Sequence, residues 1–179
     1  MTTLIKVGVS ACLLGERVRY DGGHMHDPTI TDTLGRLFTF HPVCPEVECG
    51  MPIPREPMRL EGDPASPRLM TRQSRIDKTD QMLSYCNQKV QDLEKADICG
   101  FIFKKDSPSS GLYRVKVFNP EDGALREAGR GLFADAFARH FPQMPVEEAE
   151  RLNDTSIREN FIERVFAFRL WRDSLDTRP

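Results

Sequence analysis

The chain has 179 residues, enough for one ordinary domain with a buried core. Apolar residues make up 39% of the sequence and charged residues 29%, a balance that excludes an intrinsically disordered chain. The net charge is −2, so no overall basic field indicates a nucleic-acid-binding protein.

The amino-terminal sequence shows neither a membrane span nor a secretory signal. Its apolar stretch is too short to cross a bilayer, and it lacks the h-region and small-residue cleavage site of an exported protein. The cytoplasm is therefore the expected location. In that reducing compartment the five cysteines are not expected to form disulfides, which leaves core, metal-ligand or nucleophile roles.

The amino-terminal half alternates predicted strands with glycine- and proline-rich loops. Alternating apolar residues predict a first strand at Leu4–Val9, and apolar residues at helical spacing predict a short helix over Pro28–Phe38. A second strand is expected at Phe38–Val43, followed by a proline-rich loop. Weaker strand patterns cover Met58–Glu61 and Arg68–Thr71.

The carboxyl-terminal half contains the strongest helical patterns. Helices are predicted over Lys78–Ala96, from the Gly129-Arg130-Gly131 segment to His140, and over Asp154–Trp171. Between the first two lie a short apolar run at Ile98–Phe103, typical of a buried strand, and a strand pattern at Tyr113–Phe118.

This alternation predicts an α/β fold with a largely parallel sheet flanked by helices. Ligands of such folds bind beyond the carboxyl ends of the strands. The loops that follow the first strand, the second strand and the Ile98–Phe103 strand carry cysteine, serine, lysine and acidic residues. We therefore expect the functional site at the carboxyl-terminal ends of these three strands.

The five cysteines divide into two groups. Cys86 lies on the apolar face of a predicted helix, and Cys99 shares a predicted strand face with Phe101 and Phe103. Both are expected to be small core residues, the commonest role of a free cysteine.

The other three cysteines lie in loops and are candidate metal ligands. Cys12 follows a strand end, while Cys44 and Cys49 bracket a loop too rich in proline to be a core element. Thiolates at such junctions can converge on a metal or cluster. A mixed zinc site formed by His24 and His26 with Cys44 and Cys49 is the alternative, because zinc accepts nitrogen and sulfur ligands together.

Four blocks of residues resemble the signature blocks of the thiouracil desulfidase family, in order and at suitable spacing over Lys6–Val146. They are Ser10-Ala11-Cys12-Leu13-Leu14-Gly15, Arg19-Tyr20-Asp21-Gly22, Pro42-Val43-Cys44-Pro45-Glu46 and Ser107-Pro108-Ser109-Ser110-Gly111. The resemblance implies an α/β domain with a 4Fe-4S cluster held by three cysteines, so that one iron has no protein ligand. It also implies an activity in which that iron binds the sulfur of a thiocarbonyl and water replaces the sulfur without net redox change.

The chain departs from the family pattern at the third cluster ligand. The family has cysteine where this chain has Ser110, whereas Cys49 stands at a position that is not usually cysteine. We interpret this as migration of a ligand and expect Cys12, Cys44 and Cys49 to hold the cluster. Cys99 is the alternative third ligand.

Catalytic and substrate-binding residues are expected in the same loops. A carboxylate beside the cluster is the natural base for activating water, and Glu46 matches the family block, with Glu48 as the second candidate. Ser107 is expected to orient the pyrimidine of the substrate or to protonate one of its ring nitrogens. The expected contacts to substrate are Ser109, Ser110 and Lys105. A nucleotide phosphate of the substrate could be neutralised by Lys105 and the neighbouring Lys104, or bound by the N–H groups of Gly129-Arg130-Gly131.

The tail resembles the start of the second domain of longer relatives, which act on 4-thiouridine or thiolated transfer RNA. We expect a desulfidase-like domain at residues 1–146 and a helical extension at residues 147–179. The apolar stripe of the last helix, around Phe161 and Val165, calls for a partner surface, which is the domain core, a second copy of the chain or a missing domain. A non-enzymatic zinc- or cluster-binding module that supports a partner domain is the alternative function.

Overall fold

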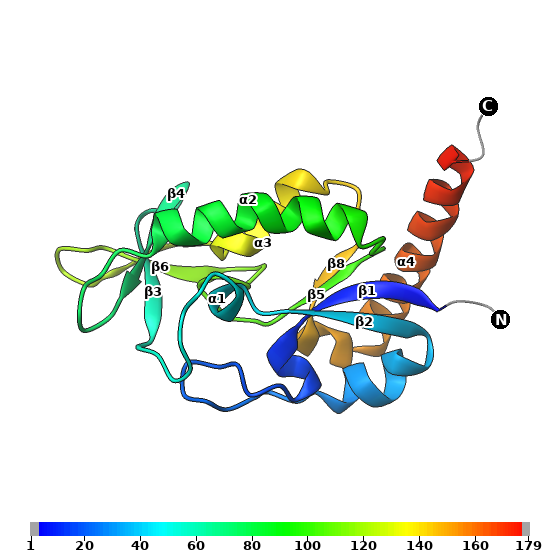
Figure 1. Ribbon diagram of the computed structural model, residues 1–179, viewed down its shortest axis with the longest axis horizontal. Helices are drawn as coiled ribbons and strands as arrows, with labels where there is room; N and C mark the ends of the chain where they lie inside the picture. Colours follow the sequence, from blue (N-terminus) through cyan, green and yellow to red (C-terminus); the bar gives the residue numbers. More distant parts are fainter. Residues whose placement is uncertain (1–3, 177–179) are drawn as a thin grey trace.

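Two four-stranded sheets form the frame of the molecule in the computed structural model, which describes residues 4–176 and, at positions 126–128, only the backbone (Figure 1). The first sheet has the strand order β2-β1-β5-β8, and every neighbouring pair in it is parallel. Its strands are β1 (Ile5–Ser10), β2 (Phe38–Val43), β5 (Phe101–Phe103) and β8 (Val146–Glu148). The predicted α/β fold with a parallel sheet is thus confirmed.

The second sheet is mixed and has the strand order β4-β3-β6-β7. Its strands are β3 (Met58–Asp63), β4 (Ser66–Thr71), β6 (Val115–Phe118) and β7 (Leu125–Gly129). The hairpins β3–β4 and β6–β7 are antiparallel, and β3 pairs with β6 in parallel. This sheet extends the molecule on the side away from the two termini (Figure 1).

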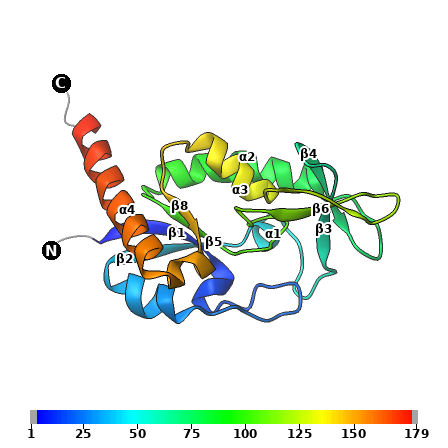
Figure 2. The same ribbon diagram turned by 180° about the vertical axis from the view of Figure 1, so that it is seen from behind.

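Helices cover both faces of the first sheet. The helices are α1 (Pro45–Glu48), α2 (Thr79–Lys95), α3 (Leu132–His140) and α4 (Thr155–Asp176), with short segments η1 (Ala11–Leu14), η2 (Thr29–Thr33), η3 (Leu34–Arg36) and η4 (Ala149–Asn153). Helices α2 and α3 lie side by side on one face, and α4 lies with the short segments on the other (Figures 1 and 2).

Strand β5 shows how the sequence fills the two cores. Phe101 and Phe103 point into the core beneath α2 and α3, whereas Ile102 points into the core beneath α4. This alternation follows from the two-residue period of a strand. Gly8 of β1 lies where a β-carbon would meet the ring of Phe101 at 2.3 Å, so the large ring fits only because its neighbour has no side chain.

The core also corrects the placement of Cys99. Cys86 and Cys99 are both fully buried, as predicted. However, Cys99 belongs to the core beneath α4 with Ile102, not to the face of Phe101 and Phe103, because it precedes β5 and the chain is not yet in the regular strand.

Several predicted elements change in extent. The helix expected over Pro28–Phe38 is one π-helical turn followed by a 3₁₀ turn, because three β-branched threonines and Gly35 disfavour a regular helix. The sequence patterns missed α1, β7 and β8. The boundary predicted between residues 146 and 147 falls inside β8, the edge strand of the first sheet, which its acidic composition conceals.

The last helix joins the core with its first half only. Phe161 and Val165 are buried beneath the first sheet, whereas Leu170 is 71% exposed and the final turns extend beyond the rest of the domain (Figure 1). The predicted apolar stripe is therefore partly covered by the domain itself. Within residues 4–176, no helix is long and apolar enough to cross a membrane.

Candidate active site

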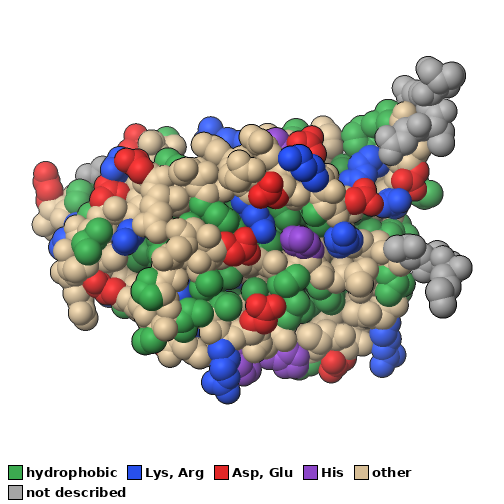
Figure 3. All heavy atoms as spheres, viewed as in Figure 1, with side chains coloured by type: hydrophobic (Ala, Val, Ile, Leu, Met, Phe, Trp, Pro, Cys, Tyr) green, Lys and Arg blue, Asp and Glu red, His purple; other side chains and the backbone are tan. Residues whose placement is uncertain are grey.

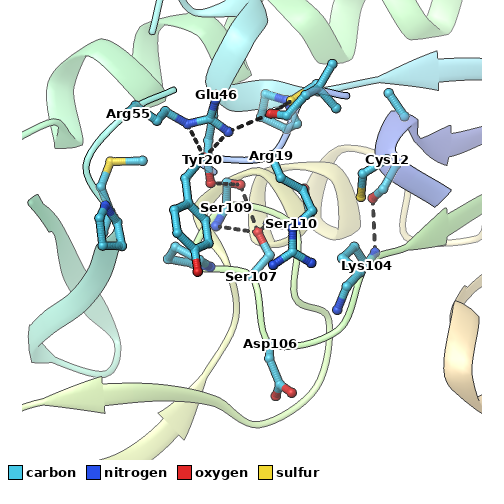
Figure 4. A pocket seen from close by; sticks show the side chains of 18 of the residues that line it. Cys12, Arg19, Tyr20, Glu46, Arg55, Lys104, Asp106, Ser107, Ser109 and Ser110 are labelled. Atoms are coloured by element: carbon cyan, nitrogen blue, oxygen red, sulfur yellow. Dashed lines mark hydrogen bonds and ion pairs between the residues drawn. The ribbon is translucent and has the colours of Figure 1, made fainter. Parts of the chain in front are cut away.

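A cavity of about 340 Å³ opens at the carboxyl-terminal ends of β1, β2 and β5 (Figure 4). Its walls come from the residues that follow these three strands, together with the Arg19–Tyr20 turn, Arg55, the Pro57–Met58 pair and Arg72. The three loops that were expected to converge thus line one cavity, as the parallel arrangement of the strands requires.

Two cysteines bring their side chains to this cavity. Cys12 lies in η1, directly after β1, and Cys44 lies between β2 and α1. Burial raises the pKa of the Cys12 thiol to about 11, although Lys104 acts in the opposite direction. Burial also raises the pKa of Cys44. Without a bound metal, both side chains are neutral thiols at pH 7.

The two candidates for a third ligand occupy different surroundings. Cys49 ends α1, and its thiol donates a hydrogen bond to the carbonyl oxygen of Glu46 at 3.3 Å. It does not line the cavity, and burial raises its pKa. Ser110 does line the cavity, and its hydroxyl makes no hydrogen bond within residues 4–176. The cavity thus has two thiols and one hydroxyl in its wall.

The remaining candidate ligands lie elsewhere. Cys99 precedes β5 and is therefore at the opposite end of the sheet from the cavity. His24 accepts a hydrogen bond from the backbone N–H of His26, and His26 contacts Thr31; neither lines the cavity. In the described part of the chain, no three histidine, cysteine or acidic side chains are already assembled as a metal site.

Glu46 stands at the centre of a hydrogen-bond network in the cavity wall. One carboxylate oxygen accepts the Ser109 hydroxyl at 3.0 Å, and the other accepts Arg55 Nε at 2.7 Å. The Ser109 and Ser107 hydroxyl oxygens lie 3.0 Å apart, so the network continues to Ser107. Arg55 also donates to the carbonyl oxygen of Val18 at 2.9 Å, which fixes the Glu46 side chain between two loops (Figure 4).

The neighbouring acid, Glu48, faces away from the cavity. Its carboxylate accepts the backbone N–H of Cys44 at 3.0 Å and the Tyr85 hydroxyl at 2.8 Å, and it pairs with Lys89 at 2.7 Å. Burial, together with the charge of Glu48, raises the pKa of Tyr85 far above its usual range. Glu48 therefore links the start of α1 to α2 and is not the carboxylate of the cavity.

The serine loop, residues 107–111, is held rigidly against the start of α3. Four consecutive backbone N–H groups, those of residues 131–134, donate to the carbonyl oxygens of Pro108, Ser109 and Gly111 at 2.8–3.1 Å. The side chain of Ser107 in turn accepts the N–H of Ser110 at 3.0 Å. The helix N-terminus expected to bind a phosphate is thus already occupied by the loop.

Cationic side chains surround the opening of the cavity. Lys105 pairs with Glu150 at 2.8 Å, and Arg19 is 3.6 Å from Asp21. Lys104 donates to a backbone carbonyl at 2.7 Å, and neither Lys104 nor Arg72 has a carboxylate partner within the described residues. The cavity therefore combines soft sulfur donors with positive charge.

Sequence reasoning missed several of these lining residues. Arg55 and Arg72 come from a proline-rich loop and from the end of β4, and no local pattern marks them. Tyr20 and Arg19 belong to a block that was singled out, but no role was assigned to their side chains. Their spacing from the cysteines was the one available signal.

Comparisons with known proteins agree with this geometry. A family model described as 2-thiouracil desulfurase matches residues 7–149. The solved structure of the [4Fe-4S]-dependent thiouracil desulfidase TudS is 27% identical, with a TM-score of 0.66, and the match covers 87% of this chain and 98% of that one. No curated protein sequence matches the chain.

The matched region contains β2 to β8, all of β1 except its first two residues, α1 to α3 and the whole wall of the cavity. It ends at residue 149, before α4. On this match, which spans most of its length, the chain belongs to the 2-thiouracil desulfurase family.

Proposed function

We propose that this protein removes sulfur from a thiolated pyrimidine in an iron–sulfur-dependent reaction without net redox change. The thiocarbonyl and one water become a carbonyl and hydrogen sulfide, so no electron donor is needed. The observation that carries the proposal is the presence of two thiols, Cys12 and Cys44, in the same cavity wall as the Glu46–Ser109–Ser107 network. Membership of the family supports it.

The proposed cofactor is a 4Fe-4S cluster with one iron that has no protein ligand. The two cavity thiols suit a cluster that binds soft donors. Cys12 and Cys44 would hold it together with Cys49, whose side chain must turn from the Glu46 carbonyl toward the cavity. When bound, the cluster supplies a soft Lewis acid for the sulfur of the substrate.

Glu46 is the proposed general base. Two nitrogens of Arg55 lie within 2.7 Å of one carboxylate oxygen, whereas the other accepts only the Ser109 hydroxyl among the described residues and retains a lone pair for a water in the cavity. It would take a proton from the water that attacks the thiocarbonyl carbon. Ser109 and Ser107 extend this network along the cavity wall, and Ser107 is the proposed group that orients the pyrimidine or protonates its ring nitrogen.

The substrate is a free 2- or 4-thiouracil or a larger molecule that contains thiolated uridine. Lys104 and Arg72 line the cavity without a carboxylate partner in the described chain, which favours a substrate with a negative charge. Lys105, proposed from the sequence as a substrate contact, would have to leave Glu150 to serve. Thiolated transfer RNA is the largest of the proposed substrates.

The surroundings of the site fit a reducing compartment, and we propose the cytoplasm, where free cysteines persist. The exposed end of α4, with Leu170 and Trp171, is the proposed docking surface for a second copy of the chain or for a further domain. Acidic and basic side chains are interspersed over the face shown in Figure 3, so its coloured part presents no continuous basic patch for RNA.

Anaerobic reconstitution followed by a desulfidation assay tests the proposal. The protein is reconstituted with iron and sulfide, assayed for both, and mixed with 2-thiouracil, 4-thiouracil or 4-thiouridine while thiocarbonyl absorbance and released sulfide are measured. We expect equimolar loss of thiocarbonyl and gain of sulfide. A fully loaded protein that leaves all three compounds, and thiolated transfer RNA, unchanged would refute the activity.

A series of ligand variants tests the proposed cluster site through iron content alone. We expect Cys12→Ser, Cys44→Ser and Cys49→Ser each to lose most bound iron, because three thiolates hold the cluster. Cys86→Ser is the matched control: Cys86 lies on the buried face of α2 and does not line the cavity, so its replacement should leave iron content unchanged. Full iron in Cys49→Ser, with loss in Ser110→Ala, would instead assign Ser110 as the third ligand.

A further inference from the structure

Tyr20 brings one aromatic ring to the cavity. Among the described residues that line it, this is the one aromatic side chain. Tyr20 is 41% exposed and belongs to neither hydrophobic core. Figure 4 shows its ring at the cavity beside Arg19 and the serine loop. Packing of the fold therefore gives no account of an aromatic residue at this place.

The backbone beneath Tyr20 is fixed by a tight turn. The N–H of Gly22 donates to the carbonyl oxygen of Arg19 at 3.0 Å, so Tyr20 takes the second position of the turn and its side chain projects from the corner. Gly22 has a φ of +78°, which favours glycine. The carbonyl oxygen of Tyr20 also accepts the N–H of Arg55 at 2.8 Å. The ring is thus presented from a rigid support.

We propose that Tyr20 is the platform on which the pyrimidine ring of the substrate stacks, an inference that rests on the proposed function. A flat aromatic side chain binds a base through its face with little loss of conformational freedom. Tyr20 shares the cavity with Cys12, Cys44 and Glu46. A pyrimidine stacked on it would have its thiocarbonyl edge in the same cavity as the two thiols and the carboxylate of Glu46.

The hydroxyl of Tyr20 is not part of the proposed contact. It makes no hydrogen bond within residues 4–176. Arg19 approaches the ring with its guanidinium carbon 5.7 Å from the ring centroid, and this side chain is held loosely by Asp21. A cation at this distance is attracted to the face of the ring and helps to hold its orientation. Stacking by the ring, and not donation by the hydroxyl, is therefore the property to test.

Three variants separate the ring from the hydroxyl and from simple apolar volume. With the thiolated pyrimidine that the wild type converts fastest, Tyr20→Phe should keep the wild-type KM. Tyr20→Ala should raise KM about 5- to 100-fold, the range expected for one lost stacking contact. Tyr20→Leu should fall between them. In all three, kcat should change less than threefold and iron content should match the wild type.

A matched pair of substrates isolates the planarity of the ring. The 5,6-dihydro counterpart of the substrate keeps the thiocarbonyl but has a puckered, non-aromatic ring. The wild type and Tyr20→Phe should prefer the planar compound by kcat/KM. That preference should shrink at least fivefold in Tyr20→Leu, because the intrinsic reactivity of the two compounds cancels when enzymes are compared.

The outcomes distinguish failure of the platform from failure of the proposed activity. Turnover by the wild type with unchanged KM in Tyr20→Ala, or an unchanged planar preference in Tyr20→Leu, overturns the stacking role alone. A fall in kcat with constant KM also overturns it, because a platform acts on binding. Absence of turnover in iron-loaded wild type overturns the proposed function and the platform with it.

Discussion

Two acids in one short helix have opposite roles, and their partners explain why. Glu46 and Glu48 both lie in α1. Glu46 faces the cavity, where Arg55 and Ser109 hold its carboxylate, whereas Glu48 turns toward Tyr85 of α2. Residues two apart on a helix point in widely different directions. Which of the two acids serves the cavity therefore depends on the residues that each side chain faces in the folded protein.

Replacement of these two acids gives a matched test of the general base. Glu46→Gln should lower kcat at least 100-fold while iron content is retained, because removal of a positioned base typically costs that much. Glu48→Gln should leave kcat within a few-fold of the wild type, since Glu48 does not line the cavity. Steady-state desulfidation with iron analysis checks both. Equal activity in the two variants would remove Glu46 from the base role.

The sequence allowed the cavity to be predicted better than its individual contacts. Cys12, Cys44 and Ser107 were placed together because each follows a strand, and parallel strands end at one edge. Arg55 escaped prediction because its partner Glu46 and its contact Val18 lie on other segments. Whether Cys49 reaches the cavity also depends on the orientation of a side chain at a helix end, which residue spacing does not specify.

At the scale of elements, helix α1 shows how a local signal was misread. The segment after Cys44 was expected to be irregular because of its prolines, yet Pro45 is the first residue of a helix. Proline is favoured at that position, where its missing N–H has no helical partner and its fixed φ suits the helix. The same residue type that breaks a helix interior thus begins one here.

Strand β8 escaped prediction because of its acidic residues. The two acids of β8, Glu147 and Glu148, resemble surface residues in sequence but are nearly buried. Glu147 pairs with Arg151 at 2.8 Å, and Glu148 accepts the N–H groups of Leu112 and Tyr113 at 3.0 Å. Partners outside the strand, one nearby in sequence and two distant, therefore make an acidic strand acceptable in the sheet.

The contact between the serine loop and α3 leads to a prediction about Gly131. A β-carbon at this position would lie 2.5 Å from the backbone carbon and oxygen of Ser109. Gly131→Ala should therefore displace the loop, lower stability by about 1–3 kcal/mol as overpacking does, and lower kcat/KM. Denaturant unfolding and steady-state kinetics measure the two effects.

Gly35→Ala is the matched control for that substitution. The nearest atoms to a β-carbon at Gly35 lie 3.6 Å away, which is ordinary contact. Alanine there should leave activity unchanged and should not reduce stability, because it restricts the unfolded chain without a clash. If Gly131→Ala behaved like Gly35→Ala, the loop would not be held against α3 as described.

The β3–β4 hairpin carries a buried carboxylate whose effect on stability depends on pH. Arg75 and Arg59 donate to Glu61 at 2.5–2.7 Å, and they lower the pKa of Glu61. The contribution is complete above the unfolded pKa of about 4.3 and is lost as the pH falls through the lower folded pKa.

Glu61→Gln should therefore destabilise the protein by about 1–2 kcal/mol at pH 7, an amount reduced by the partial exposure of Arg75. The difference from the wild type should shrink toward zero below the folded pKa of Glu61. Urea unfolding at pH 7 and at a pH below the folded pKa of Glu61 measures this difference in stability. Glu159→Gln, at an exposed position, is the control. A difference that stays constant with pH would contradict the assigned ionic role.

At the scale of the whole molecule, the two sheets meet beside the cavity. Strands β1, β2 and β5 of the first sheet supply the cysteines and the serine loop, while Met58 and Arg72 reach the cavity from the ends of the second. The loops between them close its walls. Neither sheet alone forms the site, so the geometry of the site depends on how the two sheets pack together.

The two halves of α4 should respond differently to truncation of their side chains. Phe161→Ala should lower the free energy of unfolding by about 3–5 kcal/mol, because Phe161 is buried beneath the first sheet. Leu170→Ala should change it by less than about 0.5 kcal/mol, since this side chain is exposed. Equal effects in denaturant unfolding would mean that α4 packs on the domain in another way.

The attachment of the serine loop to α3 has a consequence for how substrates of different sizes are admitted. Residues 107–111 form a wall that cannot swing aside without breaking the hydrogen bonds to residues 131–134. The Arg19–Tyr20 turn also lines the cavity, and within the described residues it makes no hydrogen bond to the serine loop, so it can be changed without disturbing that wall. Redesign of the enzyme for bulkier thiolated compounds should therefore lengthen or reshape that turn and leave the serine loop as it is.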